Sequence, residues 1–242
     1  DISFTVSDDA SAIAGVLSEG DELNNADDVD VVGGTIDVAA ADAVQDITRY
    51  DAVASGYVIE DSAGSVLGDT RTILDGGVAQ VNVNSIASAN VGVELGSLED
   101  ALYAGYSSDI SFTVSDDASA IAGVLSEGNE LNNAEDVDVI GGTIDVADAA
   151  SVQDITRYDA AASGYVIEDS AGSVLGDTGT ILDGGVAHVD VNSIASANIG
   201  VALGGLEDAL YAGYSSDISF TVSDDASAIA GVLAQGDELN NA

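Results

Sequence analysis

Residues 4–26, FTVSDDASAIAGVLSEGDELNNA, decide the fold, because the chain contains this stretch three times. It returns as FTVSDDASAIAGVLSEGNELNNA at Phe112 and as FTVSDDASAIAGVLAQGDELNNA at Phe220, 108 residues further on each time. A fixed period of this length must be interpreted before any local motif. We therefore divide the chain into repeat 1 (1–108), repeat 2 (109–216) and the first coil of a truncated repeat 3 (217–242). We expect it to be a part of a longer tandem array.

The repeated stretch itself combines a strand with a helix. Residues 4–7 alternate apolar and polar side chains, which is typical of a strand with one buried face. The two aspartates that follow are residues that commonly cap a helix N-terminus. Ile13, Val16 and Leu17 then recur at the spacing of one helical face, and Gly20 is suited to end the helix. The stretch therefore predicts a strand followed directly by a helix.

A shorter rhythm runs through each repeat. Segments of strand type recur roughly every 25 to 30 residues, and stretches with helical spacing follow them. The predicted strands begin near Phe4, Val29, Tyr57, Val81, Phe112, Val137, Tyr165, Val189 and Phe220. This pattern predicts an α/β solenoid, in which strand-helix coils of about 27 residues stack their strands into a parallel sheet at ~4.8 Å spacing. The alternative is a parallel β-helix, a fold without helices.

Several finer expectations follow from this pattern. The second coil should contain a helix over residues 38–54, and Gly33-Gly34 should form a tight turn where neighbouring coils approach closely. Five apolar residues with helix or strand spacing should face the interior. These are Ile13, Leu17, Ile59, Leu67 and Leu98.

The charge balance is extreme and restricts the partners. The chain has 44 acidic residues against three Arg and no Lys, and its formal net charge is −41. Its hydrophobic fraction of 46% is too high for a disordered acidic tail. Nucleic acid and anionic lipid need Lys or Arg to neutralise phosphate, so neither is an expected partner. Cations are the expected partners, and we expect no membrane-spanning segment, because no apolar run reaches ~18–20 residues.

Two stretches carry a resemblance to a known class of repeats. FTVSDDASAIAGVL at residues 4–17 and YVIEDSAGSVL at residues 57–67 resemble the Y-x-I-x-D-x-A-x-N-L repeats of giant bacterial surface and secreted proteins, including RTX-associated and cyanobacterial adhesin-like chains. This chain has Ser11 and Gly64-Ser65 where those repeats commonly have Asn. The resemblance implies an extracellular or cell-surface location and a structural or adhesive role. It implies no enzymatic residue.

Calcium is the cofactor that the composition best suits, because hard cations prefer oxygen ligands. Asp28-Val29-Asp30 opens like an EF-hand loop, but Val32 and Ala39 stand where further ligands belong. Gly33-Gly34 likewise lacks the third glycine of an RTX nonapeptide. What remains is a row of aspartates that follow the strands, which we interpret as helix caps in the first place and as candidate calcium ligands in the second. They are Asp8, Asp9, Asp61, Asp116, Asp117, Asp169, Asp224 and Asp225.

Catalytic chemistry has little basis in this sequence. The chain has no Cys, and its one histidine, His188, is replaced by Gln80 at the matching position of repeat 1. Ser-His-Asp and Cys-His mechanisms therefore lack a residue that both repeats share. Acidic pairs are abundant, but nothing separates a catalytic pair from the acidic background. We predict that the chain is not an enzyme, with a polysaccharide-active β-helix enzyme as the remote alternative.

These observations favour a structural role. The leading hypothesis is a structural repeat module of an extracellular bacterial filament, surface layer or giant adhesin, which forms an elongated acidic rod and self-associates into a filament or array. The runner-up is an adhesive module that binds carbohydrate or another cell surface. In both cases the function resides in a repeated surface and not in a single catalytic pocket.

Overall fold

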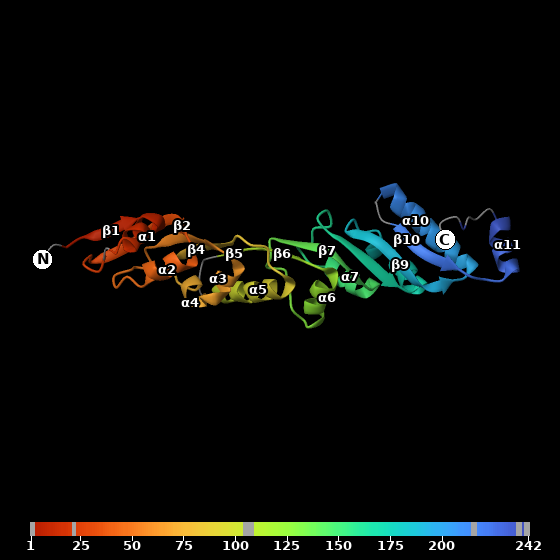
Figure 1. Cartoon of the computed structure of the whole chain (residues 1–242), viewed down its shortest axis with the longest axis horizontal. Coiled ribbons are helices and arrows are strands. Elements are labelled where there is room, and N and C mark those ends of the chain that lie inside the picture. Colours follow the sequence, from red (N-terminus) through yellow and green to blue (C-terminus); the bar gives the residue numbers. More distant parts are fainter. Residues whose placement is uncertain (1–2, 21–22, 104–108, 214–216, 236–238, 240–242) are drawn as a thin grey trace. The chain divides into compact units, whose positions relative to one another are not determined.

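The computed structural model describes residues 3–20, 23–103, 109–213, 217–235 and 239. The chain divides into two compact units. Unit 1 comprises residues 1–114 and 131–135, and unit 2 comprises residues 115–130 and 136–242. Strands and helices alternate along each unit (Figure 1).

The first sheet contains five parallel strands, and each pairs with the strand that follows it in the chain. They are β1 (Thr5–Asp8), β2 (Asp28–Ile36), β3 (Gly56–Asp61), β4 (Val78–Val83) and β5 (Ile110–Ser111). The helices between them are α1 (Ala10–Ser18), α2 (Val38–Gln45), α3 (Ala63–Gly68), α4 (Thr70–Ile73) and α5 (Ala89–Tyr103). Neighbouring helices pack on one another, α1 on α2 and α3 on α5.

The second sheet repeats this arrangement, again with its five strands in chain order. They are β6 (Thr113–Asp116), β7 (Asp136–Ile144), β8 (Gly164–Asp169), β9 (Val186–Ala195) and β10 (Asp217–Val222). The helices are α6 (Ala118–Ser126), α7 (Val146–Gln153), α8 (Ala171–Gly176), α9 (Thr178–Ile181), α10 (Ala197–Gly213) and α11 (Ala226–Ala234). Strands occur at all nine predicted places, and the architecture is α/β with open parallel sheets. The helix-free alternative is wrong, because a helix follows every strand or strand pair in the chain.

The core lies between the strands and the helices that follow them. Val29 and Val31 of β2 are fully buried, as are Tyr57 and Ile59 of β3, because alternate residues of a strand point to one face. Ile13, Ile59 and Leu98 face the interior as expected. Leu17 and Leu67 are half-buried instead, and the buried residues of their helices are Ala10 and Ile13 in α1 and Ala63 and Val66 in α3.

The helix of the second coil is shorter than predicted. The expectation of a helix over residues 38–54 is wrong, because α2 ends at Gln45 with Asp46 as its C-cap. The chain then turns back to β2, where the Val29 N–H donates to the Arg49 carbonyl at 2.9 Å and the Asp51 N–H donates to the Val29 carbonyl at 3.0 Å. Tertiary hydrogen bonds therefore override helical spacing over residues 46–54.

Gly33-Gly34 lies inside β2 and forms a bulge in place of the expected turn. Both residues have positive φ, and the register with β3 shifts between Val32 and Thr35. A Cβ on Gly34 would lie 2.9 Å from the Ala10 amide nitrogen, at the start of α1. The close approach of two coils at this point is confirmed, and it requires glycine.

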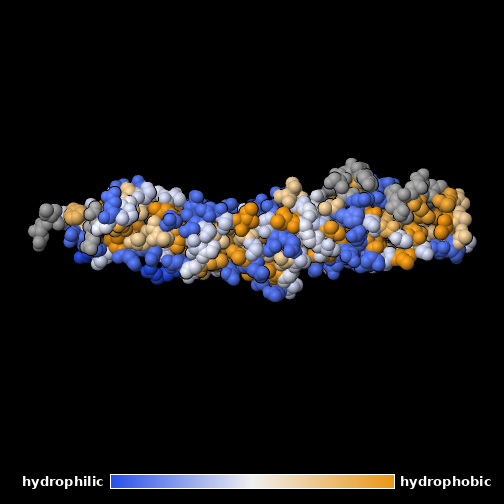
Figure 2. Space-filling model, viewed as in Figure 1, coloured by the Kyte–Doolittle hydropathy of each residue, from blue (hydrophilic) through white to orange (hydrophobic). Residues whose placement is uncertain are grey.

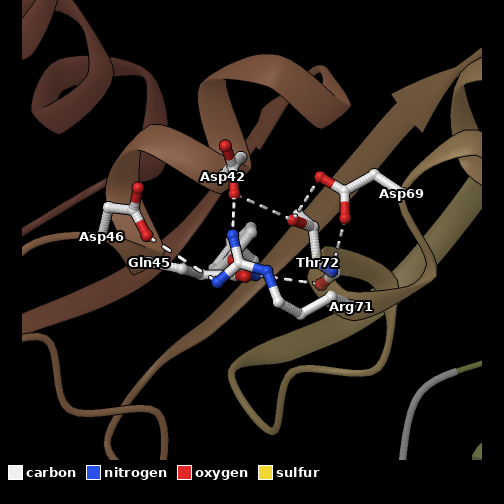
Figure 3. A network of polar contacts seen from close by, with 7 residues as sticks. Asp42, Gln45, Asp46, Asp69, Arg71 and Thr72 are labelled. Atoms are coloured by element: carbon white, nitrogen blue, oxygen red, sulfur yellow. Dashed lines mark hydrogen bonds and ion pairs between the residues drawn. The ribbon is translucent and has the colours of Figure 1, made fainter.

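A polar network connects α2 with the coil that follows it (Figure 3). The Gln45 side-chain amide donates to the Tyr57 hydroxyl at 2.8 Å and to the Thr72 carbonyl at 3.0 Å. Arg71 of α4 forms ion pairs with Asp42 and, at 3.7 Å, with Asp46. Repeat 2 keeps the Gln153–Tyr165 bond but has Ala150 and Gly179 in place of the Asp42–Arg71 pair. The buried part of the network is thus common to both repeats, and the exposed ion pair is not.

Candidate metal centre

The aspartates that directly precede helices act as N-caps. Asp9 accepts from the Ala12 amide of α1 at 3.0 Å. Asp117 and Asp225 occupy the same place before α6 and α11. The hydrogen bonds from Ser11 and Ala12 hold the pKa of Asp9 below its usual value. These three carboxylates therefore stabilise helix starts as charged acceptors.

The aspartates at strand ends form a second set of contacts, and these extend to the neighbouring coil. Asp61, at the end of β3, accepts from the Ser62 amide at 2.6 Å and from the Val38 amide at 3.2 Å. Val38 is the first residue of α2, which belongs to the preceding coil. In repeat 2, Asp169 accepts from Val146 in the same way, at 3.3 Å. One carboxylate thus connects two successive coils.

The same connection recurs at the other coils with different acceptors. The Ser85 hydroxyl accepts from the Ala63 amide of α3 at 3.0 Å, and Asp224 accepts from the Ala197 amide of α10 at 3.0 Å. Asp8 and Asp116 accept from the amide of the next residue, each at 2.9 Å. The predicted aspartates are therefore placed as helix caps and coil connectors, and their use as calcium ligands stays a prediction.

A different set of three aspartates lies close together in each repeat. In repeat 1, one carboxylate oxygen from each of Asp28, Asp30 and Asp51 lies within 4.8 Å of the others. Asp28 and Asp30 are two residues apart on β2 and so point to the same side of the sheet. Asp51 reaches them because the segment after α2 turns back to pair with Val29. Asp136, Asp138 and Asp159 form the same cluster in repeat 2.

The electrostatics of this cluster favour a cation. Oδ1 of Asp30 and Oδ1 of Asp138 are each buried and have no hydrogen-bond partner. Burial, followed by the negative charges of Asp136 and Asp159, raises the pKa of Asp138. A bound divalent ion would neutralise this repulsion and satisfy the unpartnered oxygen. Calcium accepts carboxylate, carbonyl and water oxygens in flexible geometry, so the donor set fits it.

Sequence reasoning missed this cluster for an identifiable reason. Asp28 and Asp30 do not continue as a contiguous EF-hand loop, and the third carboxylate comes from Asp51, beyond the intervening helix α2. The signal that could have found them is the alternation of Asp and Val in VDV of both repeats, which places acidic side chains on the face opposite the core. The position of Asp51 needs the tertiary pairing with Val29.

No family model, curated protein or solved structure matches this chain significantly. Within the described residues, no helix combines the length and apolarity needed to cross a bilayer. His188 pairs with Asp190 at 2.8 Å, and in repeat 1 Gln80 pairs with Asn82 at 2.9 Å in the same place. A polar pair, not a histidine, is what the two repeats share at this position.

Proposed function

We propose that this chain is a structural repeat module of an extracellular bacterial filament, surface layer or giant adhesin, as the resemblance of its repeats implies. In this proposal, strand-helix coils of about 27 residues stack as an α/β solenoid and build an elongated acidic rod. The observation that carries it is the strict chain order of parallel strands in both sheets. Each new coil adds to the edge that the previous coil provides, so the arrangement can be extended without limit.

The contacts between coils support the same proposal. A side-chain oxygen at the end of one strand accepts the first amide of the preceding helix, and this recurs for Asp61, Ser85, Asp169, Ser193 and Asp224. These bonds satisfy helix amides that would otherwise need water. Because every bond joins nearest neighbours, the stack is held by local contacts repeated along the chain. A solenoid is expected to be held in this way, by contacts between nearest neighbours and not by a single globular core.

The experiment that tests the structural role is a length series. Chains with one additional 108-residue repeat and with two additional repeats are compared with the present chain by small-angle scattering and electron microscopy. We expect the maximum dimension to increase by the same amount with each repeat, while the cross-section stays constant. A particle that grows equally in all directions would contradict the proposal.

Calcium is the cation that we propose for the two three-aspartate clusters. Calorimetric titration should show two sites per chain, with dissociation constants on the order of 10⁻⁴ to 10⁻³ M, as in other extracellular modules. The double variant Asp30→Asn/Asp138→Asn should lose both sites. Glu19→Gln/Glu127→Gln is the matched control, because it also removes two charges, from exposed carboxylates that lie outside both clusters and outside the predicted row of aspartate ligands. Equal calcium binding by both variants would show that the ion collects elsewhere.

The adhesive alternative has its own observation in unit 2. A groove of about 420 Å³ lies between α6 and the segment from β7 to α7, and its lining combines polar residues such as Thr143, Asp145 and Glu168 with apolar residues such as Ala122 and Ile144. Its hydroxyl and carboxylate groups could accept sugar hydroxyls. Glycan binding that is lost in Glu168→Gln would favour this alternative over a purely structural role.

A further inference from the structure

Two buried glutamates occupy the same place in the two repeats and have no role in the proposed cation sites. Glu99 lies on α5 and Glu207 on α10, and their side chains belong to residues that are 6% and 5% exposed. Oε2 of each glutamate is buried and has no hydrogen-bond partner. A buried carboxyl with an unpartnered oxygen is costly when it is charged, so its protonation state matters for the fold.

The carboxyl of each glutamate lies within hydrogen-bonding reach of an aspartate of the next repeat, and the two can hydrogen-bond only when one of them is protonated. Glu99 pairs with Asp109, directly before β5, and Glu207 pairs with Asp217, the first residue of β10. The Asp109 carbonyl also accepts from the Val81 amide of β4 at 2.8 Å. We call Glu99–Asp109 and Glu207–Asp217 the junction pairs, because each joins the last helix of one 108-residue repeat to the first strand of the next.

The surroundings of the junction pairs contain negative charge. The charged groups that act on Glu99 are Asp109, Asp100 and Glu135, and those that act on Glu207 are Asp217 and Asp208. All five are carboxylates. Two carboxylates cannot donate a hydrogen bond to each other, so a contact of this kind needs one proton between them.

We propose that each junction pair holds one shared proton and acts as a pH-dependent connection between successive repeats. With the proton in place, the glutamic acid donates to the aspartate and fixes the helix against the strand. When the proton leaves to solvent, two carboxylates face each other, one of them buried, and the junction loosens. The connection is therefore strong in acid and weak in alkali.

The pH range follows from the direction of the shifts. Burial, and then the hydrogen bond and charge of Asp109, raise the pKa of Glu99 to about 8, and the same causes with Asp217 raise the pKa of Glu207 to about 7. The native state thus keeps protons that an unfolded chain releases at an ordinary glutamate pKa of ~4.3. The stabilisation is fully present below that pH and is lost as the pH rises through about 7 to 8.

The first test is a carboxyl titration by carbon-13 NMR of the full chain. We expect two glutamate signals with midpoints near 8 and 7, while exposed glutamates titrate near ~4.3. In Asp109→Asn the amide can donate to an ionised Glu99, so the Glu99 midpoint should fall, while the Glu207 midpoint stays. Midpoints near the ordinary value for both residues in the wild type would overturn the proposal.

The second test is amide hydrogen exchange at the junctions between pH 6 and pH 9, corrected for intrinsic exchange. We expect the amides of Val81 and Val189 to exchange about tenfold faster or more at the higher pH, because one unit of pKa shift corresponds to a tenfold change. Glu99→Gln/Glu207→Gln should abolish this dependence. Glu94→Gln is the control, since it removes an exposed charge from the same helix. An unchanged pH dependence in the double variant would overturn the proposal.

The third test is the same carboxyl titration in the presence of calcium. A shared proton predicts that adding calcium chloride at pH 7 leaves the Glu99 and Glu207 midpoints in place. If calcium lowered both midpoints, the junction pairs would be cation sites, and the proton-sharing proposal would be wrong. This outcome is independent of the three-aspartate clusters, because Asp30→Asn/Asp138→Asn can serve as the background for the titration.

Discussion

At the residue scale, identical side chains have different consequences because their surroundings differ. Gly92 on α5 and Gly123 on α6 are both helical glycines. A Cβ on Gly92 would lie 2.5 Å from Cγ2 of Val114, whereas a Cβ on Gly123 would have nothing within 4 Å. Gly92 therefore permits close packing of α5 on the strand of the next coil, whereas Gly123 has no close neighbour that would require a glycine.

These two glycines give a matched pair of substitutions. Gly92→Ala should destabilise the chain by about 1–3 kcal/mol, because the added methyl overpacks a filled contact. Gly123→Ala should stabilise it by about 0.4–1 kcal/mol, because alanine favours the helix and restricts the unfolded chain. Urea denaturation of each variant checks both signs. A gain in Gly92→Ala would contradict the close packing at Val114.

The ion pair of repeat 1 provides a second residue-scale prediction. Arg71 is mostly exposed, and its partner Asp42 is partly so. Because solvent screens exposed pairs, Arg71→Gly and Asp42→Ala should each cost under about 1 kcal/mol, with a coupling energy in the same range. Repeat 2 already carries both replacements, as Gly179 and Ala150. A double-mutant cycle by thermal denaturation measures the coupling, and a large value would contradict solvent screening.

At the element scale, carboxylates at strand ends hold successive coils together, as Asp61 at the end of β3 does. Burial by itself would raise the pKa of Asp61, but the hydrogen bonds from Ser62, Ser65 and Val38 together outweigh it and lower the pKa. A depressed pKa means stability that is present above the unfolded value of ~3.9 and lost as the pH falls through the folded value. The coil connection at β3 and α2 should therefore weaken in strong acid, opposite in direction to the junction pairs.

Alanine substitution tests this connection directly. Asp61→Ala leaves the amides of Val38 and Ser62 without their acceptor and should cost about 1–3 kcal/mol. Asp8→Ala removes a carboxylate from the equivalent strand position, where the Asp9 amide is the donor, and should cost less. Hydrogen exchange at Val38 locates the effect. Equal costs for the two substitutions would mean that the bond between coils adds no stability.

At the scale of the whole molecule, the net negative charge is the main influence on stability that depends on the solution conditions. A net charge of −41 with three Arg produces strong repulsion that internal cations cannot offset. The Debye length is ~30 Å at ~0.01 M salt and ~3 Å at 1 M, so charges several coils apart repel only in dilute salt. Cations should accordingly decide how stable the chain is.

Melting curves in three conditions test this expectation. The melting temperature should be lowest in low salt with chelator, higher in concentrated sodium chloride, and higher in millimolar calcium than in sodium chloride of the same ionic strength. Asp30→Asn/Asp138→Asn should remove the extra calcium effect and keep the effect of sodium chloride. Equal melting temperatures in all three conditions would mean that the negative charges are too far apart to matter.

The sequence alone determined the repeat, the positions of the strands and the helix caps such as Asp9, because periodicity and capping depend on residues close in the chain. It also favoured the α/β class over a helix-free β-helix, since Ile13, Val16 and Leu17 keep helical spacing after the first strand, but the helices of the structure excluded that alternative. Only the tertiary structure decided that α2 ends at Gln45, because the Arg49 carbonyl and the Asp51 amide bond to Val29. The same reversal of the chain after α2 places Asp51 beside Asp28 and Asp30. The packing of α5 beside the next strand likewise places Glu99 close to Asp109. Such contacts join residues that lie far apart in the sequence, and no local pattern records which coil a side chain will meet.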